Sequence, residues 1–205
     1  MLNKAKIAVM VSGGGTNLQA LIDAQSSGII KSGEIVLVLS NKPDAYALTR
    51  AKNAGIDVAV VDKKECTDRA DFEARIVEIL DGHGIDIIVL AGFMCILSAE
   101  FTGHYHDRII NVHPSLIPSF CGEGYYGLRV HEAALKYGVK VSGATVHIVN
   151  EIPDGGRILM QRAVEVLDND TPESLQRRIM EEAEWKILPL SCELMCKQIT
   201  DEKEK

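Results

Sequence analysis

Residues 7–22 read IAVMVSGGGTNLQALI, and this stretch decides the fold. It opens with five apolar residues, Ile7–Val11, a run typical of a buried strand. A glycine triplet at 13–15 follows, and leucine and isoleucine then recur at helical spacing. Thr16 and Gln19 have the spacing of a helix capping box. The stretch therefore predicts a strand, a tight glycine turn and a helix, the unit with which many α/β domains begin.

Short apolar runs and helical patterns alternate along the rest of the chain. Strands are expected at Ile7–Val11, Glu34–Ser40, Val58–Val61, Ile85–Ala91, Arg108–Val112, Ser142–Val149 and Arg157–Val166. Helices are expected at Thr16–Gly28, Asp44–Asn53, Arg69–Leu80, Ser98–Gly103 and Gly127–Tyr137, and from Thr171 to about Lys197 with a kink or break near Pro189. This alternation predicts an α/β fold with a doubly wound, mostly parallel, Rossmann-like sheet. We expect one domain over residues 1–200 and a frayed tail at 201–205.

Composition excludes several classes of protein. The 205 residues carry 22 basic and 29 acidic side chains, a net charge of −7, and contain no basic run. Nucleic acid or an anionic membrane surface is therefore not expected as the main partner. The longest uncharged apolar stretch, Ile87–Leu97, is too short to span a bilayer. The N-terminus resembles no signal peptide, so a cytoplasmic location is expected.

The five cysteines do not form a metal-binding pattern. Their number is odd and no CxxC motif is present. Cys192 and Cys196 lie one helical turn apart, and no neighbouring residue completes a tetrahedral set. We interpret them as buried thiols of a reduced protein and predict no metal.

The glycine triplet is the first candidate site. Ser12–Asn17 joins a strand to a helix whose N-terminus offers free N–H groups and partial positive charge. The loop lacks both the dinucleotide pattern GxGxxG and the Walker lysine. It therefore favours a monophosphate, although a tight turn that serves only the fold is the alternative.

The second candidate site is Asn111-Val112-His113 at the carboxyl end of the fifth strand, where open α/β sheets bind ligands. Alternation along a strand directs Asn111 and His113 to the same side. An amide donor and an imidazole can together hold an oxyanion and move a proton. The alternative is that both residues make ordinary structural contacts.

Asp154 precedes Gly155-Gly156 in the turn-rich connector 150–156. Beside His113, its carboxylate would favour the imidazolium and raise the histidine pKa. The two residues are 41 positions apart, so spacing does not show that they meet, and an ordinary turn aspartate is the alternative. Of the other histidines, His131 is expected on a helix surface and His147 as a hydrogen-bonded structural residue of a strand.

Four motifs in order resemble those of the phosphoribosylglycinamide formyltransferases, folate-dependent enzymes of purine biosynthesis. They are Ser12-Gly13-Gly14-Gly15-Thr16-Asn17-Leu18-Gln19, Leu90-Ala91-Gly92-Phe93-Met94, Asn111-Val112-His113-Pro114-Ser115-Leu116 and Asp154-Gly155-Gly156. The resemblance extends from Ile7 to about Pro189.

The resemblance implies transfer of a formyl group from the co-substrate 10-formyltetrahydrofolate to the amine of glycinamide ribonucleotide, without a metal. It implies a formyltransferase fold, with phosphate binding in residues 1–112, folate binding in 113–200, and a monomer or homodimer. The implied catalytic residues are Asn111, His113 and Asp154. The implied ribonucleotide contacts are Gly15, Thr16, Asn17 and Glu184. The implied folate contacts are Arg69, Met94, Cys95, Ile96, Leu97, Asn111, Asn150, Glu151, Ile152, Pro153 and Asp154.

Three positions depart from the pattern of that family. Trp185 follows Glu184 where histidine is common, Cys95 stands where a basic residue is frequent, and Arg157 stands where proline is common. Related enzymes with an Asn/His/Asp set act on methionyl-tRNA or hydrolyse formyltetrahydrofolate, but they usually carry an added domain. A non-catalytic nucleotide sensor is the rival of another class.

Overall fold

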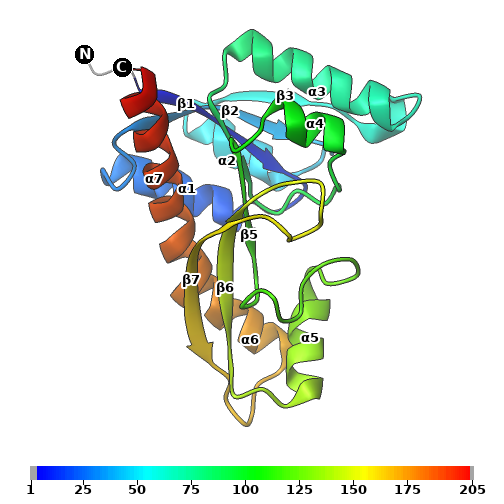
Figure 1. The fold of residues 1–205 in the computed structure, drawn as a ribbon, viewed down its shortest axis with the longest axis vertical. Coiled ribbons are helices and arrows are strands. Elements are labelled where there is room, and N and C mark those ends of the chain that lie inside the picture. Colours follow the sequence, from blue (N-terminus) through cyan, green and yellow to red (C-terminus); the bar gives the residue numbers. More distant parts are fainter. Residues whose placement is uncertain (1–3, 204–205) are drawn as a thin grey trace.

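A single seven-stranded sheet organises the computed structural model, which describes residues 4–203. The strand order is β3-β2-β1-β4-β5-β6-β7 (Figure 1). The first five strands pair in parallel, and β6 and β7 join antiparallel. The strands are β1 Ala5–Val11, β2 Gly33–Ser40, β3 Asp57–Val60, β4 Ile87–Leu90, β5 Ile109–His113, β6 Val141–Ile148 and β7 Ile158–Glu165. The mostly parallel α/β fold is confirmed.

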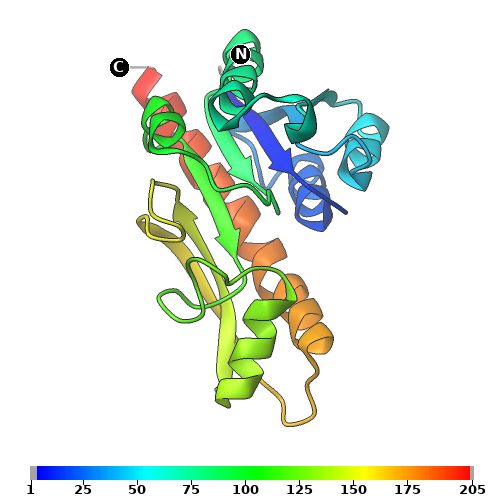
Figure 2. The same ribbon diagram turned by 90° about the vertical axis from the view of Figure 1, so that its right-hand side faces the viewer.

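Helices cover both faces of the sheet. They are α1 Thr16–Ser26, α2 Tyr46–Asn53, α3 Arg69–His83, α4 Ala99–His104, α5 Leu128–Tyr137, α6 Pro172–Ile179 and α7 Trp185–Lys203. One apolar cluster joins the sheet to α1, α2, α6 and α7, and a second joins the opposite face to α3 and α4. Figure 2 shows α5 packed beside α6 where β6 and β7 extend the sheet. Buried, β-branched strands explain this two-sided packing.

The start of α1 differs from the sequence prediction. Gly15 takes the N-cap position in a left-handed conformation (φ 73°), and no side chain caps the helix. The predicted capping box of Thr16 and Gln19 is therefore wrong. Thr16 is already the first helical residue, and its hydroxyl points to the Met180 sulfur at 3.9 Å instead.

The C-terminal helix also differs. The expected break near Pro189 is absent, and Pro189 lies inside α7. A π-helical turn at Met180–Glu184 interrupts the helix earlier. Because α7 begins at Trp185, the carbonyl that Pro189 leaves unbonded belongs to the first residue of the helix.

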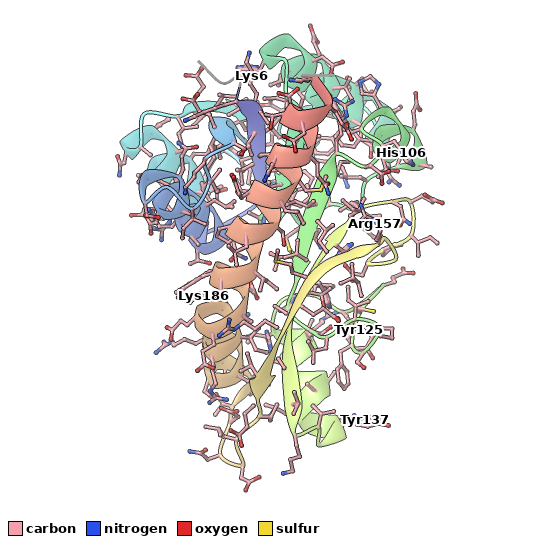
Figure 3. All side chains as sticks on the ribbon, turned by 60° about the vertical axis from the view of Figure 1, so that its left-hand side comes forward. Lys6, His106, Tyr125, Tyr137, Arg157 and Lys186 are labelled. Carbon is pink, nitrogen blue, oxygen red and sulfur yellow. The ribbon has the colours of Figure 1, made fainter. Side chains whose placement is uncertain are left out.

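The helix also runs on through residues 201–203, where fraying was expected. Lys203 donates to Asp86 at 2.5 Å, and Asp86 accepts from the backbone N–H of Lys6 near the start of β1. Figure 3 shows Lys6 beside the end of α7. The end of α7 is therefore tied to the sheet, while residues 204–205 of the expected tail lie outside the described part.

Candidate active site

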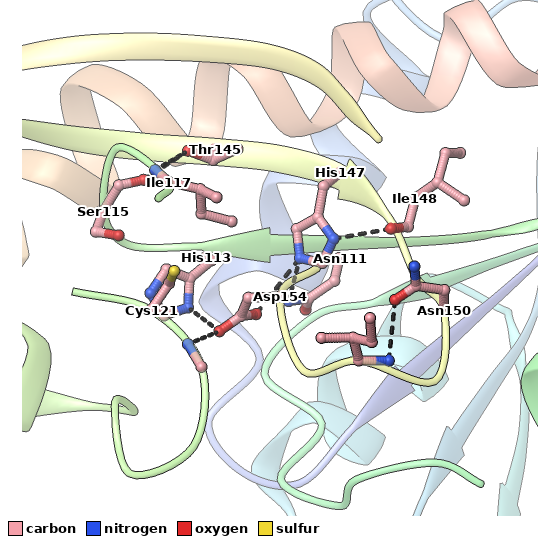
Figure 4. A network of polar contacts seen from close by, with 12 residues as sticks. Asn111, His113, Ser115, Ile117, Cys121, Thr145, His147, Ile148, Asn150 and Asp154 are labelled. Atoms are coloured by element: carbon pink, nitrogen blue, oxygen red, sulfur yellow. Dashed lines mark hydrogen bonds and ion pairs between the residues drawn. The ribbon is translucent and has the colours of Figure 1, made fainter. Parts of the chain in front are cut away.

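Asp154 brings together side chains from two strands (Figure 4). Its Oδ2 lies 3.4 Å from Nδ1 of His113 on β5, and its Oδ1 lies 3.5 Å from Nε2 of His147 on β6. The backbone N–H of Gly122 donates to Oδ2 at 2.8 Å. Of the catalytic set implied by the resemblance, His113 and Asp154 are thus in contact, and Asn111 joins them through His147.

The second ring nitrogen of each histidine faces a carbonyl oxygen. His113 Nε2 donates to Phe120 O at 2.8 Å, and His147 Nδ1 donates to Ile148 O at 2.9 Å. His147 Nε2 lies 3.2 Å from Nδ2 of the Asn111 amide, which donates one N–H to it when this ring nitrogen carries no proton. The other N–H of that amide has no partner within residues 4–203, so the group can still donate to a ligand.

The backbone of the connector holds Asp154 in place. Asp154 itself adopts a left-handed conformation (φ 56°), which aspartate tolerates better than most residues. A Cβ at Gly156 would lie 1.8 Å from Ile148 O, so only glycine fits there. The Asp-Gly-Gly sequence is therefore needed to fold the connector back over β5.

Burial controls the charges at this centre. It lowers the pKa of His113 below its ordinary value of 6.5, and His147 adds to this, although Asp154 and the Phe120 carbonyl oppose it. Burial works to raise the pKa of Asp154, but His147, His113 and the Gly122 N–H outweigh it and lower that pKa overall. At neutral pH Asp154 is ionised and His113 is neutral. The expectation that Asp154 would hold His113 as an imidazolium is thus wrong, because His113 is 4% exposed and the cost of a buried charge prevails.

The glycine loop adjoins Glu184, far along the chain. Asn17 Nδ2 donates to Glu184 Oε2 at 2.7 Å across the start of α1 and the π-helical turn. Burial raises the pKa of Glu184 to about 7, and the bond from Asn17 only partly offsets this. The loop itself is held by Arg50, which donates to Gly14 O at 2.9 Å. The predicted ribonucleotide contacts Gly15, Thr16, Asn17 and Glu184 therefore lie together.

The predicted folate residues fall on two segments. Arg69 at the start of α3 donates to Ile96 O at 3.0 Å, which ties it to segment 94–97. In that segment Met94 and Ile96 are exposed, whereas the Leu97 side chain is packed in the core. The second segment, Asn150–Asp154, has an exposed Ile152, and its turn is closed by Asn150 Oδ1, which accepts from the Ile152 N–H at 3.0 Å.

Two further histidines lie near this centre. His147 is the hydrogen-bonded strand residue that the sequence predicts, and its contacts with Asn111 and Asp154 were not predicted. The signal lies in the antiparallel pairing of Asn111 with His147, a register that sequence alone does not give. His131, expected on a helix surface, is fully buried, and neither ring nitrogen has a partner within the described residues. His131 lies with Val130 and Ala134 on the buried side of α5.

Residues 4–203 contain neither a membrane-spanning helix nor a cluster of metal ligands. No helix in this range is long and apolar enough to cross a membrane. Over the same range, no group of three or more His, Cys, Asp or Glu side chains is placed to hold a metal ion.

Comparisons with known proteins agree with the resemblance. The formyl transferase family model matches residues 5–191. A phosphoribosylglycinamide formyltransferase of Haemophilus influenzae is 43% identical over 185 residues, 90% of this chain and 84% of that protein. The chloroplastic phosphoribosylglycinamide formyltransferase of Arabidopsis thaliana is 41% identical over 181 residues, 87% of this chain but only 61% of that protein, less than two thirds of its length.

Solved structures agree as well. The crystal structure of glycinamide ribonucleotide transformylase 1 from Symbiobacterium toebii has a TM-score of 0.89 at 40% identity, with 95% of this chain and 89% of that chain covered. Similarity of sequence and of fold over nearly the whole chain thus gives one assignment. The chain belongs to the formyl transferase family, and within it to the phosphoribosylglycinamide formyltransferases.

Proposed function

We propose that the protein transfers a formyl group from 10-formyltetrahydrofolate to the primary amine of glycinamide ribonucleotide in purine biosynthesis. The observation that carries this proposal is the buried cluster of Asn111, His113 and Asp154 on the same chain as the glycine loop. The family and the named relatives support the same reaction. Phosphate binding would lie mainly in residues 1–112 and folate binding mainly in 113–200.

The reaction needs an acceptor for one proton and a donor to an oxyanion. The amine attacks the formyl carbon, the carbonyl electrons move to oxygen, and the free N–H of Asn111 donates to that oxyanion. Neutral His113 takes the proton of the attacking amine, and Asp154 stabilises the resulting imidazolium. His113 then protonates the folate nitrogen as its bond to carbon breaks, and the oxyanion collapses to the product amide.

One contact must change for this to occur. In the structure the Phe120 carbonyl occupies His113 Nε2, while Asp154 faces Nδ1. A neutral imidazole carries a single N–H, which here lies on Nε2. We infer that Phe120 gives way and that the ring takes the tautomer whose N–H lies on Nδ1 and donates to Asp154, so that the unprotonated Nε2 turns to the reacting atoms. This exchange also removes a competing acceptor from the imidazole.

The substrates divide between the two candidate sites. The N–H groups at Gly15–Asn17 would bind the phosphate, as helix N-termini do. The carboxyl of Glu184 and the amide of Asn17 would bind the ribose. The segments 94–97 and 150–154, with Arg69, would line the folate site. The protein would act on small molecules in the cytoplasm, without a metal.

An absorbance assay of formyl transfer tests the proposal. Folate product should appear with glycinamide ribonucleotide present and should not appear when it is omitted. Equal rates in both cases would indicate that the protein hydrolyses formyltetrahydrofolate and does not transfer the formyl group to the ribonucleotide. No product in either case, together with a thermal shift larger for AMP than for the ribonucleotide, would indicate a nucleotide sensor.

A further inference from the structure

Two carbonyl groups of the glycine loop are bonded to α2, the helix of the next strand–helix unit. The N–H of Ala47, in the first turn of α2, donates to Gly13 O at 3.0 Å. Arg50, nearly one turn further along α2, donates from Nε to Gly14 O at 2.9 Å. The loop and the helix are in close contact, since a Cβ at Gly15 would lie 2.6 Å from Ala47 Cβ. The conformation of the loop before α1 therefore depends on α2.

These contacts determine where the N–H groups of the loop point. The peptide between Gly14 and Gly15 is trans, and in a trans peptide the C=O and the N–H point in opposite directions. Because Gly14 O faces Arg50, the N–H of Gly15 faces away from α2. By the same geometry, the N–H of Gly14 faces away from Ala47. Neither N–H donates a hydrogen bond within residues 4–203, so both are free to bind a ligand.

Three contacts hold the guanidinium of Arg50 in this position. Besides the Gly14 carbonyl, Nη1 donates to Gln19 Oε1 at 3.0 Å, and Gln19 in turn donates to Asp23 Oδ1 at 2.9 Å. The guanidinium carbon also lies 5.1 Å from the centre of the Tyr46 ring, a favourable cation–π distance. Arg50 forms no ion pair within residues 4–203. Its charge is therefore not neutralised by a carboxylate and is directed at the loop.

A charged donor on a carbonyl oxygen changes the other end of the peptide. The guanidinium draws electron density toward Gly14 O, and hydrogen bonds in a chain strengthen one another, so the N–H of Gly15 becomes a stronger donor. An anion bound at that N–H would be stabilised by Arg50 through the peptide, without touching the guanidinium. On a chain of net charge −7, the unneutralised charge also favours an anion at this loop through its field.

We propose that Arg50 is a positioning residue for the phosphate of the ribonucleotide. It acts through the Gly14 carbonyl, which it uses to orient and polarise the Gly15 N–H. This inference rests on the proposed function, in which that N–H binds the phosphate. Arg50 does not act on the reacting atoms, so it determines how strongly the protein prefers a phosphorylated substrate and leaves the rate of the bound complex unchanged.

Titration with glycinamide ribonucleotide and with its riboside, which lacks the phosphate, tests this role. Arg50→Met keeps the apolar stem of the side chain and removes the donor. Its affinity for the ribonucleotide should fall roughly tenfold, the low end of the range for a hydrogen bond to a charged group, while its affinity for the riboside stays at the wild-type level. The KM for the ribonucleotide should rise by the same factor, with kcat and the KM for folate unchanged. Arg50→Lys can still donate to the Gly14 carbonyl, so it should lose less affinity than Arg50→Met.

Lys52→Met is the matched control, because Lys52 is an exposed cation of the same helix. It should keep the wild-type ratio of the two affinities. Wild-type affinity for the ribonucleotide in Arg50→Met, equal losses for ribonucleotide and riboside, or a lysine variant as weak as the methionine variant would each overturn the positioning role.

The same measurements separate this role from the reaction. If the phosphate strengthens binding, Arg50→Met weakens that binding and no formyl group is transferred, the proposed function alone is contradicted. If formyl transfer occurs and Arg50→Met keeps the wild-type preference for the phosphorylated substrate, the positioning role alone is contradicted.

Discussion

Glu184 shows how one buried residue can couple substrate binding to pH. Its carboxyl is 6% exposed and receives one hydrogen bond, from Asn17. Its pKa of about 7, against 4.5 for the free group, means that the folded protein holds a proton there that the unfolded chain lacks between those values. Stability contributed by this group is therefore lost as pH rises from 4.5 through 7.

Glu184→Gln should therefore stabilise the folded protein at pH 8 and weaken its binding of the ribonucleotide. The variant keeps an oxygen for Asn17 but buries no charge, so its free energy of unfolding at pH 8 should exceed that of the wild type by up to roughly 3 kcal/mol. The gain should vanish near pH 4.5. Urea unfolding at both pH values measures it, with the exposed Glu181→Gln as control, and an equal effect at both pH values would contradict the account.

His131 makes the opposite contribution. Burial, followed by the charge of His113, lowers its pKa to about 4 from 6.5. Between these values the unfolded chain binds a proton that the folded protein does not, so stability falls as pH drops through this range. Between pH 7 and pH 4, the free energy of unfolding of His131→Phe should fall by about 3 kcal/mol less than that of the wild type. Urea unfolding across this range checks it; a pH dependence unchanged from the wild type would mean that His131 is charged when folded.

At the scale of elements, the glycine loop separates structural from binding glycines. A Cβ at Gly15 would lie 2.6 Å from Ala47 Cβ and would strain a left-handed backbone, whereas at Gly14 no atom lies within 4 Å. Gly15 substitutions therefore disturb α2 as well as the site. Gly14→Ala should leave the free energy of unfolding nearly unchanged. It should weaken ribonucleotide binding at least tenfold and leave the affinity for folate unchanged. Isothermal titration of both ligands measures this. Equal losses of affinity for the two ligands would contradict the assignment of the phosphate site to the loop.

The connector 150–156 should respond to folate. It carries the exposed Ile152 and the left-handed Asp154, both among the predicted folate contacts. Amide hydrogen exchange in this segment should slow more with folate alone than with glycinamide ribonucleotide alone, because folate would cover its backbone. Protection by the ribonucleotide alone would place the folate elsewhere.

Most elements follow from local patterns. The apolar run before His113 predicts β5 to within a residue at each end, and Thr171-Pro172 predicts the start of α6. The π-helical turn at Met180–Glu184 has no comparable local signal. Its position depends on packing of α6 and α7 against the sheet, and it is this turn that places Glu184 beside Asn17.

The site depended on information beyond local patterns. Alternation predicts that Asn111 and His113 share a side, but not that Asp154 meets His113 across 41 residues. That contact requires the antiparallel register of β5 with β6 and a left-handed Asp154. The resemblance supplied what spacing could not. The predicted rise of the His113 pKa was wrong because burial lowers this pKa, and burial depends on how the whole molecule packs.

At the scale of the whole molecule, the sheet joins two functions. Its parallel half presents the glycine loop, and its antiparallel strands carry the connector that returns Asp154 to β5 (Figure 1). The chemistry therefore depends on one contact between distant segments. The central claim is that His113 and Asp154 act as a unit, with the carboxylate stabilising the imidazolium formed during transfer.

Single-turnover formyl transfer at saturating substrates tests this claim, in wild type, Asp154→Asn, His113→Ala and the double variant. Asparagine tolerates the left-handed backbone of position 154 but removes the charge, so Asp154→Asn lowers the His113 pKa further and should slow transfer on the order of 10²–10³-fold. His113→Ala should be at least as slow. The account predicts a double variant little slower than the slower single variant. Penalties that multiply, or an Asp154→Asn protein with the wild-type rate, would contradict it.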